Sequence, residues 1–256
     1  MGQKVRKHWL MLVSAFFCWE YTRSHRKNIR RNSWDSRTKV SNIFLTNLSM
    51  ETSTELNHMS HQVAYEALES YKPTYPEEII YLEEMKSFLD THDVFAHRSN
   101  LAGHFTGSAW VINPDATHAL LIHHVKLDRW FQPGGHTEYG DASFRDASLR
   151  EAREEIGVDG FKLVSDTIFD IDVHPIPEKG MEPAHKHYDV RYLLTLDNMD
   201  VSKIDTIEVH GARWIAIDEL LQDKSISQSI RRMAEKTRQY RLSHVVKKSV
   251  QENIDK

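Results

Sequence analysis

Residues 134–158 read GGHTEYGDASFRDASLREAREEIGV, a glycine-rich turn followed by a helix with an excess of negative charge. Residues three and four positions apart are neighbours on a helix surface, so Glu151, Glu154 and Glu155 are expected to share one side of it. Arg150 supplies only one positive charge against these three carboxylates. A bound hard cation with oxygen ligands is the simplest explanation of so much negative charge on one side of the helix. Magnesium is the first candidate.

The same stretch has the features of an amphipathic helix that packs on a sheet. Leu149, Ala152 and Ile156 form a narrow apolar stripe beside the carboxylates. Ser143, with an acidic residue three positions later, resembles a capping-box start, and Gly157 is placed to end the helix. Most charge runs are solvated helix faces. The combination of glycine turn, start signal, crowded carboxylates and stop signal instead favours a metal-binding function.

The segment resembles the Nudix box, G-x5-E-x7-R-E-U-x-E-E-x-G-U with U a bulky aliphatic residue. The similarity is close from Arg150 to Val158. Two positions depart from the pattern. Asp141 stands at the first glutamate, with eight residues rather than seven before Arg150, and Ala152 is small for its position. We expect Asp141 to support the turn.

The resemblance extends beyond the box, since WFQP at 130–133 and WIAIDEL at 214–220 are also similar to this family. It covers about residues 100–222 and implies an α/β fold, the Nudix-type α/β/α sandwich with a mixed sheet, to which N-terminal helices are added. The implied activity is that of a metal-dependent pyrophosphohydrolase, which cleaves a phosphoanhydride bond of a nucleoside diphosphate linked to another moiety.

The resemblance also implies the roles of individual residues. The metal, Mg²⁺ with Mn²⁺ as a substitute, would be held by the carboxylates of Glu151, Glu154 and Glu155 and by the carbonyl of Gly134. Such a metal offsets phosphate charge and lowers the pKa of a bound water. Arg150 would orient Glu154. The general base is left open between Glu208, at the start of the last expected strand, and Glu182.

Other functions fit the residues less well. An isoprenoid-diphosphate isomerase shares this fold, but its family needs a catalytic cysteine, and Cys18 lies outside the domain. A non-catalytic nucleotide-sensing Nudix module usually has a damaged box or an added DNA-binding unit, whereas the carboxylates are present here. A non-enzymatic scaffold would leave the crowded carboxylates unexplained.

Two expected strands place polar residues on one face, because side chains alternate along a strand. FDIDVH at 169–174 puts two aspartates and a histidine on one face, and HYDVRY at 187–192 does the same for a histidine, an aspartate and an arginine. A half-solvated hairpin with cross-strand Asp–Arg pairs is the more common meaning of this pattern. The long segment between the strands, 175–185, favours a pocket instead.

On the pocket interpretation, we expect Arg191, His185 and His187 to contact the substrate. His136, inside the glycine turn, is expected to reach it as well. His185 and His187 are two residues apart on a strand and can share a metal. The sequence shows no third ligand clustered with them, which favours substrate contact.

Length and composition predict one domain with extensions, since the chain has 256 residues and 40% hydrophobic content. The expected organisation is a basic, disordered leader at 1–49, a helical segment at 50–98, the Nudix domain at 99–222 and a C-terminal helix and tail at 223–256. Apolar spacing predicts helices over 60–71, 77–89 and 226–246, and strands over 105–112, 119–125, 161–173, 186–196 and 207–217. The buried candidates of the second helix are Ile79, Leu82, Met85, Phe88 and Leu89.

Charge and cysteine content restrict the partners. Residues 1–49 have a net charge of +8 in a chain whose total is −4, so the rest is acidic, which argues against nucleic-acid binding. The apolar run at 9–19 is too short for stable membrane insertion, and Met50 or Met59 is the expected functional start. A single cysteine fits a cytoplasmic protein. The expected partner is a small-molecule nucleotide substrate, and the oligomeric state stays open, a homodimer included.

Overall fold

The computed structural model describes residues 59–124, 128–198, 200–201 and 209–254, all within the unit of residues 55–256. The leader expected at 1–49 and the candidate base Glu208 lie outside these residues. Where the chain is described, no helix is both long enough and apolar enough to cross a membrane.

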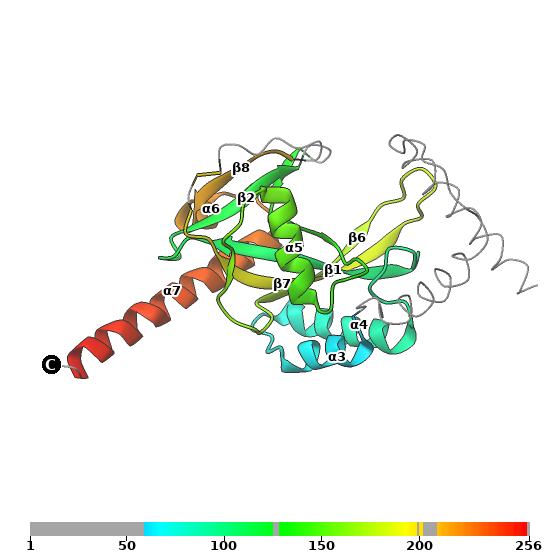
Figure 1. The fold of residues 1–256 in the computed structure, drawn as a ribbon, viewed down its shortest axis with the longest axis horizontal. Coiled ribbons are helices and arrows are strands. Elements are labelled where there is room, and N and C mark those ends of the chain that lie inside the picture. Colours follow the sequence, from blue (N-terminus) through cyan, green and yellow to red (C-terminus); the bar gives the residue numbers. More distant parts are fainter. Residues whose placement is uncertain (1–58, 125–127, 199, 202–208, 255–256) are drawn as a thin grey trace, which may run out of the picture. The chain divides into compact units, whose positions relative to one another are not determined.

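Two parallel strands form the centre of the sheet (Figure 1). These are β1 (Gly103–Ile112) and β7 (His185–Thr195), which pair continuously from Gly103 with Lys186 to Ile112 with Thr195. Every residue of β1 is buried, as expected for a strand that is covered on both faces. The pair therefore forms the rigid base on which other elements are placed.

Among the described residues, six further strands complete an eight-stranded mixed sheet. They are β2 (His118–His124), β3 (Arg129–Phe131), β4 (Gly134–His136), β5 (Lys162–Leu163), β6 (Asp170–Ile176) and β8 (Val209–Ala216). β2 and β4 pair antiparallel with β1, β3 and β8 with β2, and β5 and β6 with β7. Between β1 and β2, the Asn113 side chain accepts hydrogen bonds from the backbone amides of Thr117 and His118, which closes the turn.

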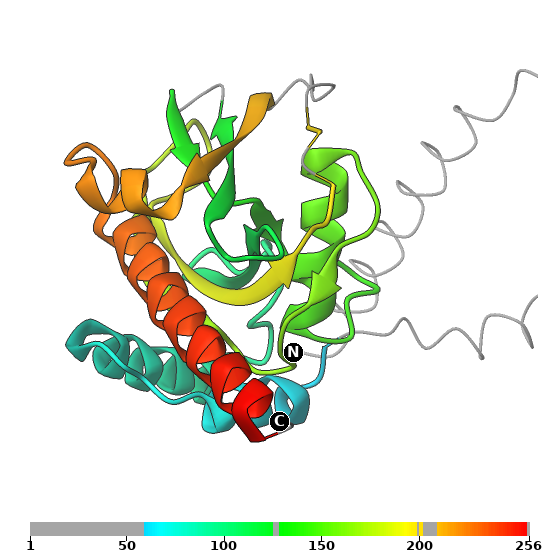
Figure 2. The ribbon, with the colours of Figure 1, turned by 90° about the vertical axis from the view of Figure 1, so that its left-hand side faces the viewer.

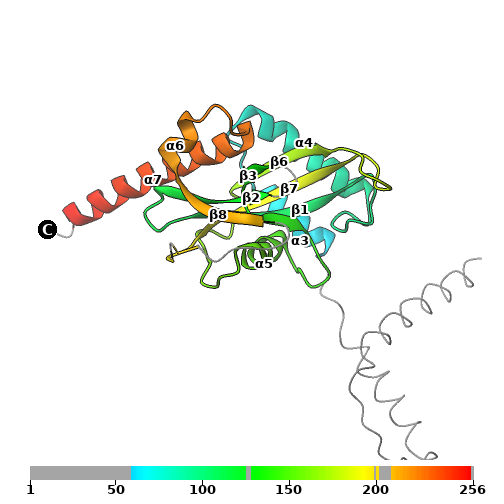
Figure 3. The same cartoon turned by 90° about the horizontal axis from the view of Figure 1, so that it is seen from above.

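Helices cover both faces of the sheet, so the predicted α/β/α sandwich with N-terminal helices is confirmed. α5 (Phe144–Ile156) packs on one face, and α4 (Pro76–Thr91), α6 (Ile217–Gln222) and α7 (Gln228–Ile254) lie on the other (Figure 3). α3 (His61–Ser70) packs against α4.

Side chains along β1 point alternately to the two faces of the sheet, so the strand contributes to an apolar cluster on each face. Ala109 and Val111 pack with Ala152 and Ile156 of α5. Trp110 points to the other side, toward α6 and α7, in a second cluster. Its indole Nε1 donates a 2.7 Å hydrogen bond to Thr237 Oγ1, so the ring is buried without an unpaired donor.

The boundaries of α5 agree with the capping signals. The Ser143 hydroxyl accepts a 3.2 Å hydrogen bond from the Asp146 amide, which satisfies one of the free N–H groups of the first turn. Gly157 ends the helix with φ of 68°, a left-handed conformation that residues with a Cβ rarely adopt. The helix that carries the three glutamates is therefore delimited as predicted.

The helix expected over 77–89 is present as α4, but one of its buried candidates is wrong. Met85, Phe88 and Leu89 are buried, whereas Ile79 is 53% exposed. Glu78 is buried in its place. Its carboxylate accepts hydrogen bonds from the Tyr71 hydroxyl, at 2.8 Å, and from Lys236 of α7.

Glu78 belongs to a buried charge network that joins α4, β6, β7 and α7. Asp170 of β6 accepts hydrogen bonds from Arg191, Arg232 and Lys236 at 2.8–2.9 Å. Burial alone would raise the pKa of Asp170, but the hydrogen bonds from Arg232 and the charges of Arg191 and Lys236 hold it below its usual value. Figure 2 shows α7 and α4 on the same side of the sheet, where this network holds them.

Candidate active site

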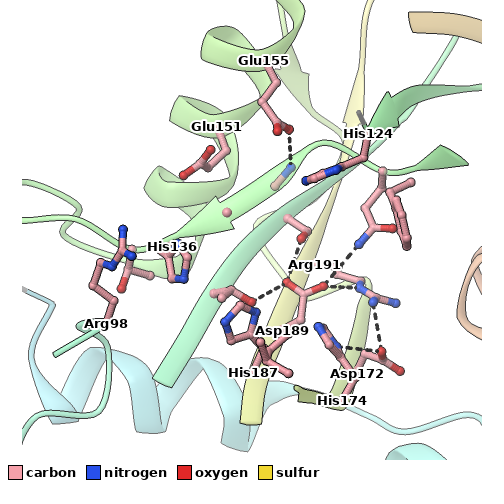
Figure 4. Close-up of a pocket in the computed structure, with 18 of the residues that line it drawn as sticks. Arg98, His124, His136, Glu151, Glu155, Asp172, His174, His187, Asp189 and Arg191 are labelled. Carbon is pink, nitrogen blue, oxygen red and sulfur yellow. Dashed lines mark hydrogen bonds and ion pairs between the residues drawn. The ribbon is translucent and has the colours of Figure 1, made fainter. Parts of the chain in front are cut away.

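A cavity of about 920 Å³ lies between the glycine turn, α5 and the strands β6 and β7. Its lining includes all three box glutamates, Gly134 and Gly135. Figure 4 shows Glu151 and Glu155 of α5 on one side of the cavity and His187, Asp189 and Arg191 of β7 on the other. The cavity therefore brings the two polar groups of the sequence, the box and the paired strands, into one site.

The glycine turn, which forms β4, contacts the carboxylates of α5 directly. The Gly134 amide donates a 2.8 Å hydrogen bond to Glu155 Oε2. At Gly135 a Cβ atom would lie 2.7 Å from Glu151 Oε1, so a larger residue would displace that carboxylate. The carbonyl of Gly134 is its predicted metal ligand. The structure adds that its amide holds Glu155 in place.

Arg150 connects the turn to the helix. Its Nη1 donates to Glu151 Oε1 and to Glu154 Oε2, both at 2.9 Å, so the expected contact with Glu154 is present. Its Nη2 donates to the His136 carbonyl at 2.8 Å and to Asp141 Oδ2 at 2.9 Å. Asp141 also accepts a 2.8 Å bond from the Glu138 amide. The turn is one residue longer than in the Nudix pattern, and aspartate is shorter than the glutamate of that pattern. A carboxylate still reaches Arg150.

The box glutamates differ in their surroundings. Burial raises the pKa of Glu151 to about 6, and the charge of Arg150 offsets this only in part. The side chain of Glu154 is 58% exposed. Carboxylate oxygens are the donors that magnesium prefers, and burial disfavours the charged form of Glu151 more than the single charge of Arg150 offsets. The donor set therefore fits a hard divalent cation.

The paired strands place three rows of polar side chains on the cavity side of the sheet, as their alternation predicted. The rows, read from β1 through β7 to β6, are His104, His187 and His174; Thr106, Asp189 and Asp172; and Ser108, Arg191 and Asp170. Asp189 accepts hydrogen bonds from Thr106 and Ser108 at 2.9 and 2.7 Å. The face is thus a connected hydrogen-bond network.

Arg191 lies in surroundings that differ from the expectation. Its side chain is 3% exposed and contacts Asp189 at 2.7 Å, Asp170 at 2.9 Å and Asp172 at 3.2 Å. Burial would lower the pKa of Arg191, but the carboxylates raise it above its usual value. Its donors are directed at these carboxylates, yet Arg191 also lines the cavity, so the expected contact with the substrate stays a prediction.

The histidines expected at the substrate converge with one that the sequence did not single out. The ring centroid of His104 in β1 lies 4.9 Å from that of His136, 5.1 Å from that of His185 and 4.7 Å from that of His187. Burial lowers the pKa of His104 to about 4 and that of His187 to about 2, with the neighbouring histidines adding to the effect. His136 and His187 line the cavity, whereas His185 lies beside it.

The candidate base Glu182 and two residues of the loop before β1 complete the surroundings of the site. Glu182 approaches His185 Nε2 at 4.0 Å and is not among the described residues that line the cavity. His97 and Arg98, from the loop before β1, do line it, and Figure 4 shows Arg98 beside His136. No local motif marks these two loop residues in the sequence.

Comparisons with known proteins give a family and several similar structures. The family model described as NUDIX domain matches residues 104–236. Among solved structures, an Ap4A hydrolase of C. elegans is 15% identical, with 53% of this chain and 96% of that chain covered and a TM-score of 0.38. A MutT protein of Methanosarcina mazei Go1 is 18% identical, with coverages of 54% and 94% and a TM-score of 0.41. A NUDIX family hydrolase of Clostridium perfringens is 24% identical, with coverages of 52% and 94% and a TM-score of 0.38. A search of curated proteins finds no match.

Proposed function

This chain belongs to the NUDIX family, and on that premise we propose that it is a metal-dependent hydrolase that cleaves a phosphoanhydride bond of a nucleoside diphosphate linked to another moiety. The observation that carries the proposal is the convergence of the glycine turn and the α5 carboxylates on one cavity. Gly134 is bonded to Glu155, and Gly135 leaves room for Glu151.

The metal would be Mg²⁺, with Mn²⁺ as a substitute. Glu151, Glu154 and Glu155, with the carbonyl of Gly134, would hold it, and when bound it would offset phosphate charge and lower the pKa of the attacking water. Arg150 keeps two of these carboxylates in place from its position between the turn and the helix. Asp141 in turn orients Arg150.

The substrate would occupy the cavity between the box and the histidines. His136 and His187 line it and offer ring nitrogens to a sugar or base. Arg98 supplies a charged donor group at the same wall, which suits a phosphate. Arg191 also lines the cavity, where its donors face Asp189, Asp170 and Asp172, and His185 lies beside it.

The general base stays a proposal between two residues. Glu182 is not among the described residues at the cavity, which argues against it. Glu208 lies outside the described residues and stays the other candidate. We also propose a cytoplasmic enzyme without a nucleic-acid partner, on the single cysteine and on the acidic charge that remains outside the basic first 49 residues.

The proposal is tested with the full chain and a panel of nucleoside diphosphate sugars, dinucleoside polyphosphates and oxidised nucleoside triphosphates. We expect at least one to release phosphate products with Mg²⁺ and none to do so after chelation. Binding of a nucleotide, measured by calorimetry, without hydrolysis of any panel member would instead support the nucleotide-sensing module. Hydrolysis that persists in chelator would contradict metal dependence.

A further inference from the structure

Three histidines that the box does not use form a cluster at the end of the sheet. One ring nitrogen from each of His104, His185 and His187 lies within 4.8 Å of the other two, and no other group of three His, Cys, Asp or Glu side chains in the described chain meets this condition. His104 and His185 are buried, and His187 is half-buried. Clustered imidazoles from two adjacent strands, largely removed from solvent, are a typical donor set for a transition metal.

The spacing of the nitrogens matches this chemistry. His185 Nε2 and His187 Nε2 are 3.4 Å apart. Two nitrogens that bind one tetrahedral zinc ion at about 2.0–2.1 Å are separated by about 3.3–3.4 Å. Two neutral imidazole nitrogens facing each other make at best one hydrogen bond between them, whereas a metal between them satisfies both lone pairs.

The other ring nitrogens show which atoms are available. His185 Nδ1 lies 2.9 Å from the Pro183 carbonyl, and His104 Nδ1 lies 3.4 Å from the Asn100 carbonyl. A carbonyl only accepts, so Nδ1 carries the proton in each ring and Nε2 carries the lone pair. His104 Nε2 is buried without a hydrogen-bond partner among the described residues. A backbone carbonyl behind two of the three rings is a common outer-shell partner of a metal-binding histidine.

We propose that His104, His185 and His187 bind a zinc ion, separate from the hard cation at the box. Glu182, whose Oε1 is 4.0 Å from His185 Nε2, is the candidate for the fourth position. Imidazole ligands favour zinc over magnesium, and the box carboxylates have the opposite preference. The two sites therefore take different metals.

The zinc ion would join three parts of the chain that form the cavity wall. It would connect β1, through His104, to β7, and it would fix the loop before β7 through His185 and Glu182. His136 packs against both His104 and His187, with centroids 4.9 and 5.1 Å apart, so the ion would also hold a cavity residue in place. The expected role is structural, in shaping the wall opposite the box.

The test measures metal binding on the full chain and does not depend on hydrolysis. Chelator-stripped protein is titrated with Co²⁺, read by visible absorption, and with Zn²⁺ in competition. We expect one tight Zn²⁺ equivalent and the spectrum of tetrahedral cobalt. His104→Gln and His185→Gln should weaken binding by more than the roughly 10- to 100-fold that loss of an outer-shell partner costs.

Two controls separate this site from others. Glu154→Gln with Glu155→Gln should leave zinc binding unchanged, and so should His244→Gln on the exposed part of α7. Zinc-edge X-ray absorption on the wild-type chain counts imidazole ligands without any substitution, in case a variant fails to fold. Absence of bound zinc, fewer than two imidazole ligands, or unchanged affinity in folded His104→Gln and His185→Gln would each overturn the proposal.

Discussion

Arg150 donates from Nε and Nη2 to the two carboxylate oxygens of Asp141, at 3.1 and 2.9 Å. The bidentate pair fixes the turn relative to α5, because the same guanidinium also contacts Glu151 and Glu154. Asp141 stands where the Nudix pattern has glutamate, and its side chain is almost fully buried. The pair is therefore a charge-assisted contact with little solvent screening.

Replacing Asp141 tests this contact. Asp141→Ala should lower the free energy of unfolding by about 1.5–3 kcal/mol, the usual loss for a hydrogen bond to a charged group, and should lower kcat because Arg150 no longer holds the glutamates. Urea unfolding and steady-state kinetics measure the two effects. Asp166→Ala breaks an exposed ion pair with Arg145 and is the control, with an expected change below about 1 kcal/mol. Equal behaviour of the two variants would contradict the prediction.

The box carboxylates are tested by isosteric changes. Glu154→Gln and Glu155→Gln should abolish turnover and spare the fold, because each removes a charge without opening a cavity. In Glu155→Gln the new side-chain amide oxygen can still accept the bond from the Gly134 amide. Circular dichroism checks the fold, and Glu219→Gln on the exposed side of α6 is the control. Turnover near wild type at saturating Mg²⁺ would show that the box is not catalytic.

Arg191→Ala is expected to act on stability before substrate use. It would leave Asp170 and Asp189 buried with one cation fewer, and breaking such a buried pair costs about 3–5 kcal/mol. Urea unfolding should show this loss, whereas Arg145→Ala on the surface should show little. A variant of normal stability with a raised KM would instead support direct contact of Arg191 with the substrate.

The network also predicts how stability depends on pH. Burial would raise the pKa of Asp172, but the charge of Arg191 and the hydrogen bond from His174 hold it well below its usual value of 3.8. A lowered folded-state pKa contributes stability that is fully present above the unfolded value and is lost as pH falls toward the folded value. Unfolding free energies from about pH 5 to about pH 2 should therefore fall less steeply in Asp172→Asn. A profile parallel to wild type would refute this.

Truncation tests the domain boundaries. A chain starting at Met50 should stay folded and active, because the leader lacks the periodicity of a core element. A start at Met59 is less suitable than the sequence suggested, since that residue is buried and would carry a charged amino group. A start at residue 99 removes Glu78 and leaves Arg232 and Lys236 with one buried carboxylate fewer. We expect aggregation of this shortest chain in size-exclusion chromatography, and a well-folded monomer would contradict the expectation.

Local patterns were sufficient for part of this structure. The limits of α5 follow from Ser143 and Gly157, because capping acts within one turn. The polar face of β6 and β7 follows from alternation along each strand. Both signals are contained in short windows of sequence, and the box residues that they place share one cavity as expected.

The other features of the site and core depend on contacts between residues far apart in the sequence. His104 joins His187 only because β1 and β7 are parallel in one particular register. The burial of Glu78 depends on Lys236, which is 158 residues away, so no pattern within α4 reveals it. The possible cross-strand Asp–Arg pairs were visible in the alternation, but that three carboxylates enclose Arg191 depends on the register of β6 and β7.

The parallel pairing of β1 with β7 also affects how the chain folds during its synthesis. Partners such as Thr106 and Asp189 are 83 residues apart, so β1 leaves the ribosome long before its central neighbour exists. Closing so long a loop is entropically unfavourable until the contacts form, and non-local pairing slows folding. During that interval β1 exposes an edge of unpaired backbone N–H and C=O groups, which favours association with other chains. Nascent chains interrupted before residue 185 should therefore be the species that depends most on chaperones.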